Sequence, residues 1–294
     1  MADLVKKIRT SSGDLQIDYN ALANLPGNQN LLINANFKAP INQRNRASYT
    51  YTTGNTGKVY TIDRWWLNGV GAKLVFNDGY MAVTLPTGCD FGQALEMDYK
   101  DYDSLTVSIK LKDDATVKTA TFSNVSTMNE STEAFVNLTS AIKAGIFVFG
   151  YGVYMYLRPV SGSISMNLEW IKLESGSVAT PFVPRPYQYE HWMCQYYYRV
   201  LSNGFFLGIA TATSESIVMP ITGIDKMRVD EPKLIVDNLI FNPLSNNPDK
   251  YVTITGGYAM LSSWCSIASF VKADAAVGEV GRIYGTIILD AEYD

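Results

Sequence analysis

The chain has 294 residues, of which 47% are hydrophobic and only 18% are charged, and its net charge is −4. This length accommodates two domains of roughly 100–150 residues each. Nucleic-acid binding is disfavoured, because neutralising phosphates needs clustered cations and the chain offers only short basic groups at 6–9 and 44–46. No run of 18 apolar residues occurs, so we expect no membrane insertion.

The cysteines, Cys89, Cys194 and Cys265, are odd in number and far apart. This spacing predicts buried free thiols, which fits folding in a reducing cytoplasm. The first ten residues are of mixed polarity and do not form the apolar core of a signal peptide.

Residues 1–29 lack sustained periodicity and carry turn formers at 13–14 and 26–27. Their apolar side chains, which include Leu15, Ile17 and Tyr19, are costly to leave exposed. We therefore expect an N-terminal attachment segment that lies along a partner or a neighbouring subunit, with a flexible tail as the alternative.

Residues 30–183 read as a series of short strands separated by turn signals, with no strong helix. Asp78-Gly79 is a hairpin signal between predicted strands at 72–76 and 80–85. Residues 39–60 read as a long polar loop, and Asp63-Arg64 beside two tryptophans as a buried structural cluster. Further strands are predicted at 91–97, 104–111, 117–122, 134–137, 145–149, 153–157 and 164–173. The pattern predicts an all-β sandwich.

Residues 184–294 form the second predicted domain. Three prolines between residues 181 and 186 predict a stiff, extended connector, because each lacks a backbone N–H. A short linker helix follows over 187–198, with aromatic side chains at helical spacing. A β-rich C-terminal domain is then predicted from strands at 204–211, 215–220, 232–241, 251–255, 258–271 and 279–292.

The junction between these domains resembles one found in tail-fibre and receptor-binding proteins of tailed bacteriophages and prophages. The residues that carry the resemblance are Lys172-Leu173-Glu174, residues 177–182, residues 184–187 and Cys194 with the tyrosines after it. Residues 13–26, 31–37, 61–66 and 227–232 resemble shorter elements of the same fibres. The resemblance implies a carbohydrate-binding-module-like jelly roll over 30–183, a C-terminal tip or trimerisation domain and a homotrimer. It also implies a place in the virion tail, after assembly in the bacterial cytoplasm.

Catalytic and metal-binding patterns are weak. His191 is the only histidine, and a dyad with Cys194 is less plausible than a satisfied, partly buried histidine. The carboxylates at 98–103 and 113–114 sit in predicted turns, where solvation explains them better than glycoside hydrolysis. We predict no cofactor. Jelly-roll sugar modules often hold a structural calcium ion, and the sequence does not exclude such an ion.

Sugar recognition relies on aromatic rings and on side chains that hydrogen-bond to hydroxyls. Aromatic residues in a polar loop are therefore informative, since rings are otherwise buried. The predicted glycan-binding residues are Tyr49, Tyr51, Tyr60, Arg44 and Asn45, with core or subunit packing as the alternative for the tyrosines.

We therefore expect a non-enzymatic tail protein that attaches the virus to a host surface glycan or protein. Its N-terminal segment would bind other tail or baseplate proteins. The alternatives are an accessory module of a carbohydrate-active enzyme, a polysaccharide-degrading tail protein, and a bacterial surface adhesin. The first two lack an acid–base pair in the sequence, and the third lacks a signal peptide.

Overall fold

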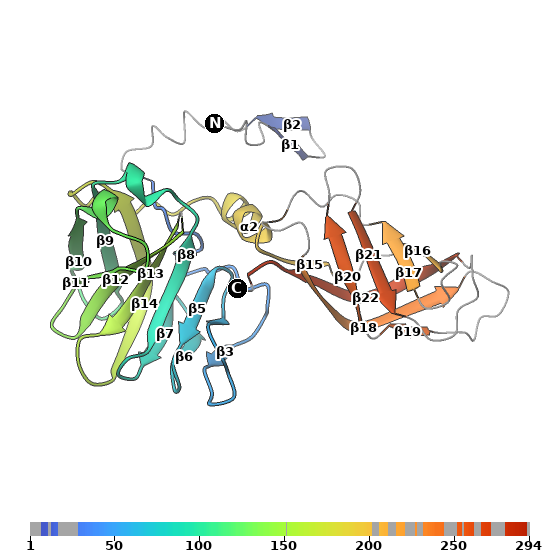
Figure 1. Cartoon of the computed structure of the whole chain (residues 1–294), viewed down its shortest axis with the longest axis horizontal. Helices are drawn as coiled ribbons and strands as arrows, with labels where there is room; N and C mark the ends of the chain where they lie inside the picture. The colour runs from blue at the N-terminus through green and yellow to red at the C-terminus, as the bar shows by residue number, and fades with distance from the viewer. Residues whose placement is uncertain are drawn as a thin grey trace. The chain divides into compact units, whose positions relative to one another are not determined.

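The computed structural model describes the chain at residues 7–10, 13–16, 29–150, 152–201, 206–210, 216–220, 227, 232–243, 252–254, 256–261, 266–271 and 280–292 (Figure 1). The protein is all-β, as predicted, apart from short helical segments. The described chain divides into two compact units. Unit 1 comprises residues 1–39, 48–57 and 67–184, and unit 2 comprises residues 40–47, 58–66 and 185–294.

The assignment of 40–47 and 58–66 to unit 2 differs from the predicted ranges 30–183 and 184–294, which place both segments in the first domain. Most of the predicted attachment segment lies outside the described residues. Within it, β1 (Lys7–Thr10) pairs with β2 (Gly13–Gln16) as an antiparallel hairpin.

Two six-stranded antiparallel sheets are built mainly from unit 1. In the β14 sheet the strand order is β10-β9-β14-β7-β6-β3. Its strands are β3 (Ser48–Thr50), β6 (Lys73–Asn77), β7 (Tyr80–Leu85), β9 (Ser104–Leu111), β10 (Val117–Ser123) and β14 (Ile164–Ser175). In the β13 sheet the order is β11-β12-β13-β8-β5-β4. Its strands are β4 (Val59–Tyr60), β5 (Trp65–Asn68), β8 (Asp90–Leu95), β11 (Glu133–Asn137), β12 (Ile142–Phe149) and β13 (Gly152–Pro159).

Alternation of side chains explains why these segments form a sandwich-like core. In β9, Leu105, Val107 and Ile109 lie on one face and are fully buried. Phe37, beside β14, packs against Phe91 of β8 with ring centroids 5.9 Å apart. Since β8 belongs to the β13 sheet, this contact lies in a core shared by the two sheets.

Residues 29–37 hold the two sheets together. The amide of Asn30 donates to the carbonyl of Ile171 at 2.9 Å, and its side-chain oxygen accepts from the amide of Leu173. The side chain of Gln93 on β8 accepts from the backbone N–H of Ile33 at 2.8 Å and donates to its carbonyl at 2.7 Å. This stretch is an irregular segment that satisfies part of its backbone through side chains.

The Asp-Gly hairpin prediction is confirmed: β6 pairs with β7, and Gly79 takes the left-handed conformation that the turn requires. The loop predicted for 39–60 contains the short strands β3 and β4 instead. Among its described residues, unit 1 also contains the short 3-10 helices η1 (Tyr99–Asp101) and η2 (Val125–Thr127).

Unit 2 begins its C-terminal part with α2 (Tyr187–Gln195), three residues shorter than predicted because Tyr198 already starts a strand. Its antiparallel sheet has the order β19-β18-β22-β16-β17-β21-β20, and β15 also pairs with β22. The strands are β15 (Tyr198–Leu201), β16 (Phe206–Ala210), β17 (Ser216–Pro220), β18 (Lys233–Pro243), β19 (Val252–Ile254), β20 (Gly256–Leu261), β21 (Ser266–Val271) and β22 (Val280–Asp290). The strand predicted over 258–271 is a hairpin of β20 and β21.

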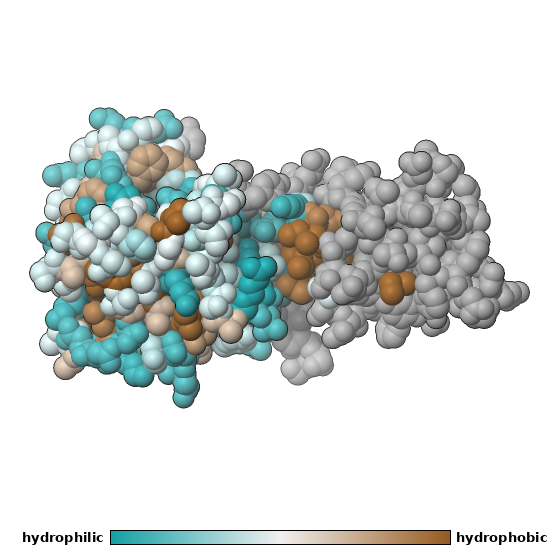
Figure 2. Space-filling model, turned by 90° about the horizontal axis from the view of Figure 1, so that it is seen from below, coloured by the Kyte–Doolittle hydropathy of each residue, from teal (hydrophilic) through white to brown (hydrophobic). Residues whose placement is uncertain are grey.

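The described surface mixes hydrophilic side chains with separate hydrophobic patches, as Figure 2 shows for one face. No described helix is long and apolar enough to cross a bilayer.

Candidate functional site

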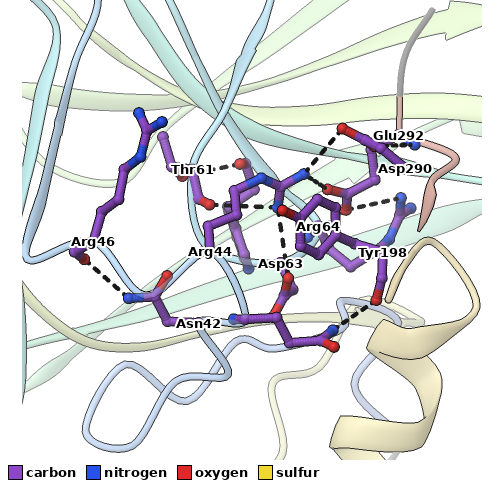
Figure 3. A network of polar contacts seen from close by, with 11 residues as sticks. Asn42, Arg44, Arg46, Thr61, Asp63, Arg64, Tyr198, Asp290 and Glu292 are labelled. Atoms are coloured by element: carbon purple, nitrogen blue, oxygen red, sulfur yellow. Dashed lines mark hydrogen bonds and ion pairs between the residues drawn. The ribbon is translucent and has the colours of Figure 1, made fainter. Parts of the chain in front are cut away.

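A network of polar side chains in unit 2 is centred on Arg44 (Figure 3). Its guanidinium lies 2.7 Å from the carboxylate of Glu292 and 3.5 Å from that of Asp63. Asp290 is a third carboxylate neighbour at 3.7 Å. Burial lowers the pKa of Arg44, but these three carboxylates outweigh it and raise the pKa above its ordinary value. Arg44 therefore stays charged inside the cluster.

Asp63 is fully buried, and its neighbours have opposing effects on its pKa. Burial raises its pKa to about 7, against the lowering effects of Arg44 and of the hydrogen bond from the backbone N–H of Gln43 at 3.0 Å. The side chain of Gln43 donates in turn to the carbonyl of Tyr198 at 2.7 Å. Asp63 thus connects the 58–66 segment to the 40–47 segment, and Gln43 connects the 40–47 segment to β15.

Arg64 is held in an uncommon backbone conformation, with φ of 76°. Its backbone N–H donates to Glu292 at 2.6 Å, and its guanidinium lies 3.9 Å from the same carboxylate. A left-handed arginine is strained, and a strong charge-assisted hydrogen bond offsets that strain.

Two tyrosines stack on the arginines of the cluster. The guanidinium of Arg44 lies 3.7 Å from the ring centroid of Tyr198, and that of Arg64 lies 3.4 Å from the ring centroid of Tyr197. Burial raises the pKa of Tyr198, so its hydroxyl stays neutral. The cluster therefore joins four stretches of chain: the 40–47 segment, the 58–66 segment, the start of β15 and the end of β22.

The prediction that Asp63-Arg64 belongs to a buried structural cluster is confirmed, since both side chains are buried. The cluster also contains partners that were not predicted, namely Arg44, Glu292 and the two tyrosines. Glu292 could not be found from sequence, since it lies 248 positions from Arg44.

The five predicted glycan-binding residues fall in both units. Tyr49 and Tyr51 lie in unit 1, while Arg44, Asn45 and Tyr60 lie in unit 2. Tyr49 and Tyr51 are 4% and 7% exposed, so neither ring offers a platform for a sugar. The Tyr49 ring packs edge-on against Phe76, and the Tyr51 hydroxyl donates to the carbonyl of Asn55. Asn45 is exposed in a turn and Tyr60 is half-buried.

A second buried network lies in unit 1 and explains much of the Lys172–Phe182 motif. The ammonium of Lys172 donates to Glu174 at 3.0 Å, to the Thr180 hydroxyl and to the carbonyls of Thr180 and Pro181. Both Thr180 donors, the backbone N–H and the hydroxyl, go to Glu174. Phe182 stacks on Trp170 with centroids 4.6 Å apart. We call residues 176–184, which this network ties to the outer face of the β14 sheet, the strap.

The chemistry of α2 argues against a His191–Cys194 dyad. Cys194 is fully buried, and burial raises its pKa well above the ordinary value, which disfavours the nucleophilic thiolate. The ring of His191 stacks on Tyr187 with centroids 6.0 Å apart, and burial lowers its pKa.

The acidic turns of unit 1 have structural hydrogen bonds. Asp98 caps η1 by accepting from the N–H of Lys100, and Asp103 accepts from the hydroxyl of Ser126. Asp113 accepts from the side chain of Asn167. Among the described residues no group of three or more His, Cys, Asp or Glu side chains is arranged to hold a metal ion.

Searches of protein-family models, of curated proteins and of solved structures find no match to this chain.

Proposed function

We propose that this chain is a non-catalytic component of a bacteriophage tail that attaches the particle to the surface of its bacterial host. The observation that carries the proposal is the anchored strap. The residues of the tail-fibre resemblance include Lys172, Glu174 and Thr180, and these three form one buried network. The resemblance thus rests on residues with a shared physical role.

The strand connections support a jelly-roll-like arrangement of unit 1. The chain passes between the two sheets from β7 to β8, from β8 to β9, from β10 to β11 and from β13 to β14. Such alternation is typical of jelly rolls, which hold two sheets of antiparallel strands. The β6–β7 and β9–β10 hairpins, the β4–β5 pair and the β11–β12–β13 meander each stay within one sheet and depart locally from strict alternation.

The buried carboxylates support a structural role over a catalytic one. Asp63 and Glu292 are held by arginines that also stack on tyrosines, which suits a rigid cross-link. In this proposal residues 1–29 attach to other tail or baseplate proteins, the chain acts as a homotrimer in the virion tail, and the host ligand is a surface glycan or protein. Asn45 and Tyr60 are the predicted glycan-binding residues with accessible side chains outside the buried cluster.

Adsorption to cells tests the proposal. Fluorescently labelled full-length protein is incubated with a panel of candidate host bacteria, untreated or treated with periodate to oxidise surface glycans. We expect saturable binding to some strains, loss of binding after oxidation if the ligand is a glycan, and no new reducing ends in the supernatant. Release of reducing ends would establish the polysaccharide-degrading alternative, and absence of binding to every strain from which a related phage is recovered would contradict attachment.

A further inference from the structure

The part of the β14 sheet next to the strap is buried on its outer face, and the groups buried there are polar. Lys172 and Glu174 are 2% and 0% exposed. Ser108 lies directly across from Lys172 on β9 and is 1% exposed. Its hydroxyl has no hydrogen-bond partner in the part of the chain that the structure describes. Because the outer face of an antiparallel sheet is commonly solvated, this burial needs a reason beyond the packing of a core.

The closed position of the strap is a balance of opposing effects. The strap gains the hydrogen bonds of Thr180 and the stacking of Phe182. Against this, an ion pair removed from water gains little net free energy, and a buried hydroxyl without a partner is unfavourable. Val178 and Val183 on the outward side of the strap are 71% and 47% exposed, so they add little apolar burial. Few apolar contacts and buried groups that favour water are features of an element that opens locally.

The strap presents to this face two groups that a sugar also presents. The hydroxyl of Thr180 accepts from Lys172 and donates to Glu174, as a sugar hydroxyl does between an ammonium and a carboxylate. The ring of Phe182 lies flat on Trp170, with centroids 4.6 Å apart and an interplanar angle of 5°. The flat face of an indole is also a surface on which the C–H groups of a sugar ring stack. The side chains that hold the strap are therefore of the kinds that hold a saccharide.

We propose that the outer face of the β14 sheet binds a neutral saccharide of the host surface, and that the strap occupies this site until the saccharide displaces it. Trp170 stacks on the sugar ring, Lys172 and Glu174 bind one hydroxyl, and the hydroxyl of Ser108 gains a partner. The Lys172–Glu174 pair has no net charge, which favours a neutral sugar over an acidic one. The inference rests on the attachment function proposed above and gives that function a site. Because the closed strap blocks the site, the apparent affinity is reduced by the fraction of molecules that are closed.

Hydrogen exchange of the full-length protein tests whether the sugar displaces the strap. The probes are surface polysaccharides purified from the same panel of candidate hosts. In the closed strap the backbone N–H of Thr180 donates to Glu174. We expect a saturating polysaccharide to speed exchange of this N–H and to leave the amides of the β6–β7 hairpin unchanged. A polysaccharide that binds while exchange of the strap stays the same or slows would overturn the proposal and leave attachment intact.

Two substitutions that both loosen the strap should have opposite effects on binding of the polysaccharide. Thr180→Val removes the hydroxyl that Lys172 and Glu174 share, so the open fraction rises and the apparent affinity should increase by roughly tenfold. Lys172→Met also loosens the strap but removes a group that binds the sugar, so the affinity should fall by roughly tenfold or more. Ser177→Ala is the control, because it changes an exposed side chain of the strap and should keep the wild-type affinity.

Phe182→Ala gives a second test that does not depend on the folding of Lys172→Met. It uncovers Trp170 and keeps the Lys172 network, so it should bind the polysaccharide more tightly than wild type does. Equal affinities of wild type, Thr180→Val and Phe182→Ala would place the glycan elsewhere and overturn this site, although attachment would stand. Absence of binding by all three proteins to every polysaccharide would overturn both this site and attachment through a glycan.

Discussion

At the scale of single residues, Arg44 is the centre of the buried polar network of unit 2. It meets three carboxylates and one tyrosine ring with little solvent access. A buried ion pair adds little net stability by itself, but removal of one partner leaves the other charges buried and uncompensated. The effect of an arginine at 44–46 on stability therefore depends on whether its side chain lies inside the buried cluster.

The pair Arg44 and Arg46 gives a direct test. Arg44→Met should lower the free energy of unfolding by about 3–5 kcal/mol, because Glu292 and Asp63 lose their shared cation. Arg46→Met removes an equal charge from an exposed side chain and should change stability by about 0.5 kcal/mol or less. Urea unfolding of both variants measures this. Equal effects would contradict the structural role of Arg44.

Asp63 should make stability depend on pH. Its pKa in the folded protein is about 7, above the ordinary value of 3.8, so folding favours its protonated form. The stabilisation is complete below about pH 4 and is lost as the pH rises towards 7. Asp63→Asn should remove this slope from a series of unfolding measurements over that range.

Asp114→Asn serves as the control for Asp63→Asn. A hydrogen bond from Lys118 lowers the pKa of Asp114 to about 2, so its stabilisation is present above the ordinary pKa and is lost only as the pH falls further. The slope between pH 4 and 7 should remain in this variant. A slope that also remains in Asp63→Asn would show that another group causes it.

At this scale the sequence predicts that Asp63 and Arg64 are buried, but it does not predict all of the residues that they contact. The sequence predicts a buried cluster at Asp63 and Arg64 because an arginine can pair with an aspartate and stack on a tryptophan at once. Arg64 meets Glu292, which lies 228 positions away, and Asp63 meets Arg44 and Gln43 from a separate segment about 20 positions earlier; no local pattern encodes either contact. Tyr49 and Tyr51 show the opposite error, since a polar neighbourhood in sequence suggested exposure for rings that pack in a core.

At the scale of elements, local signals worked where local geometry decides the outcome. The Asp-Gly turn fixed the β6–β7 hairpin, and the prolines prevented regular structure before α2. The connector was expected to be extended, and residues 179–186 form no helix or strand. Its anchoring depends on tertiary contacts that no local pattern encodes. The pairing of β14 with β9 places Thr106 beside the strap, and the Thr106 hydroxyl donates to the carbonyl of Gly176.

Thr180→Val tests the anchoring of the strap. The variant keeps the shape of the side chain but loses a hydroxyl that donates to Glu174 and accepts from Lys172, at an expected cost of about 1.5–3 kcal/mol. Limited proteolysis should cut residues 176–186 faster in this variant. Ser177→Ala lies on the same strap with an exposed side chain and should be cut at the wild-type rate. Protection that is unchanged in Thr180→Val would mean that other contacts hold the strap.

At the scale of the whole molecule, the order of the chain and the division into units do not coincide. Residues 40–47 and 58–66 lie between strands of unit 1 in sequence, yet they belong to unit 2. They bring Arg44, Asp63 and Arg64, and the two arginines neutralise Glu292 near the C-terminus. Composition and turn signals predicted two bodies but could not assign these short segments.

A fragment of residues 185–294 should therefore fail to show a cooperative unfolding transition. It lacks Arg44 and Arg64, the arginines that meet the buried carboxylate of Glu292. A longer fragment, in which residues 40–66 are joined to 185–294 through a flexible linker, should recover the transition. Calorimetry of the two chains checks this, and cooperative unfolding of the shorter fragment would show that its sheet is self-sufficient.

The interleaving of the two units also constrains how such a protein diversifies. If a genetic crossover near codon 184 replaced the C-terminal third, the new β-structure would meet residues 40–47 and 58–66 from the old parent. The incoming acidic tail would then face arginines selected for another sequence, and the chimera would carry mismatched buried charges. Exchange of the terminal region is thus expected to succeed only when both early segments are inherited with it, which predicts paired variation at positions 44, 63, 64 and 292 among natural recombinants.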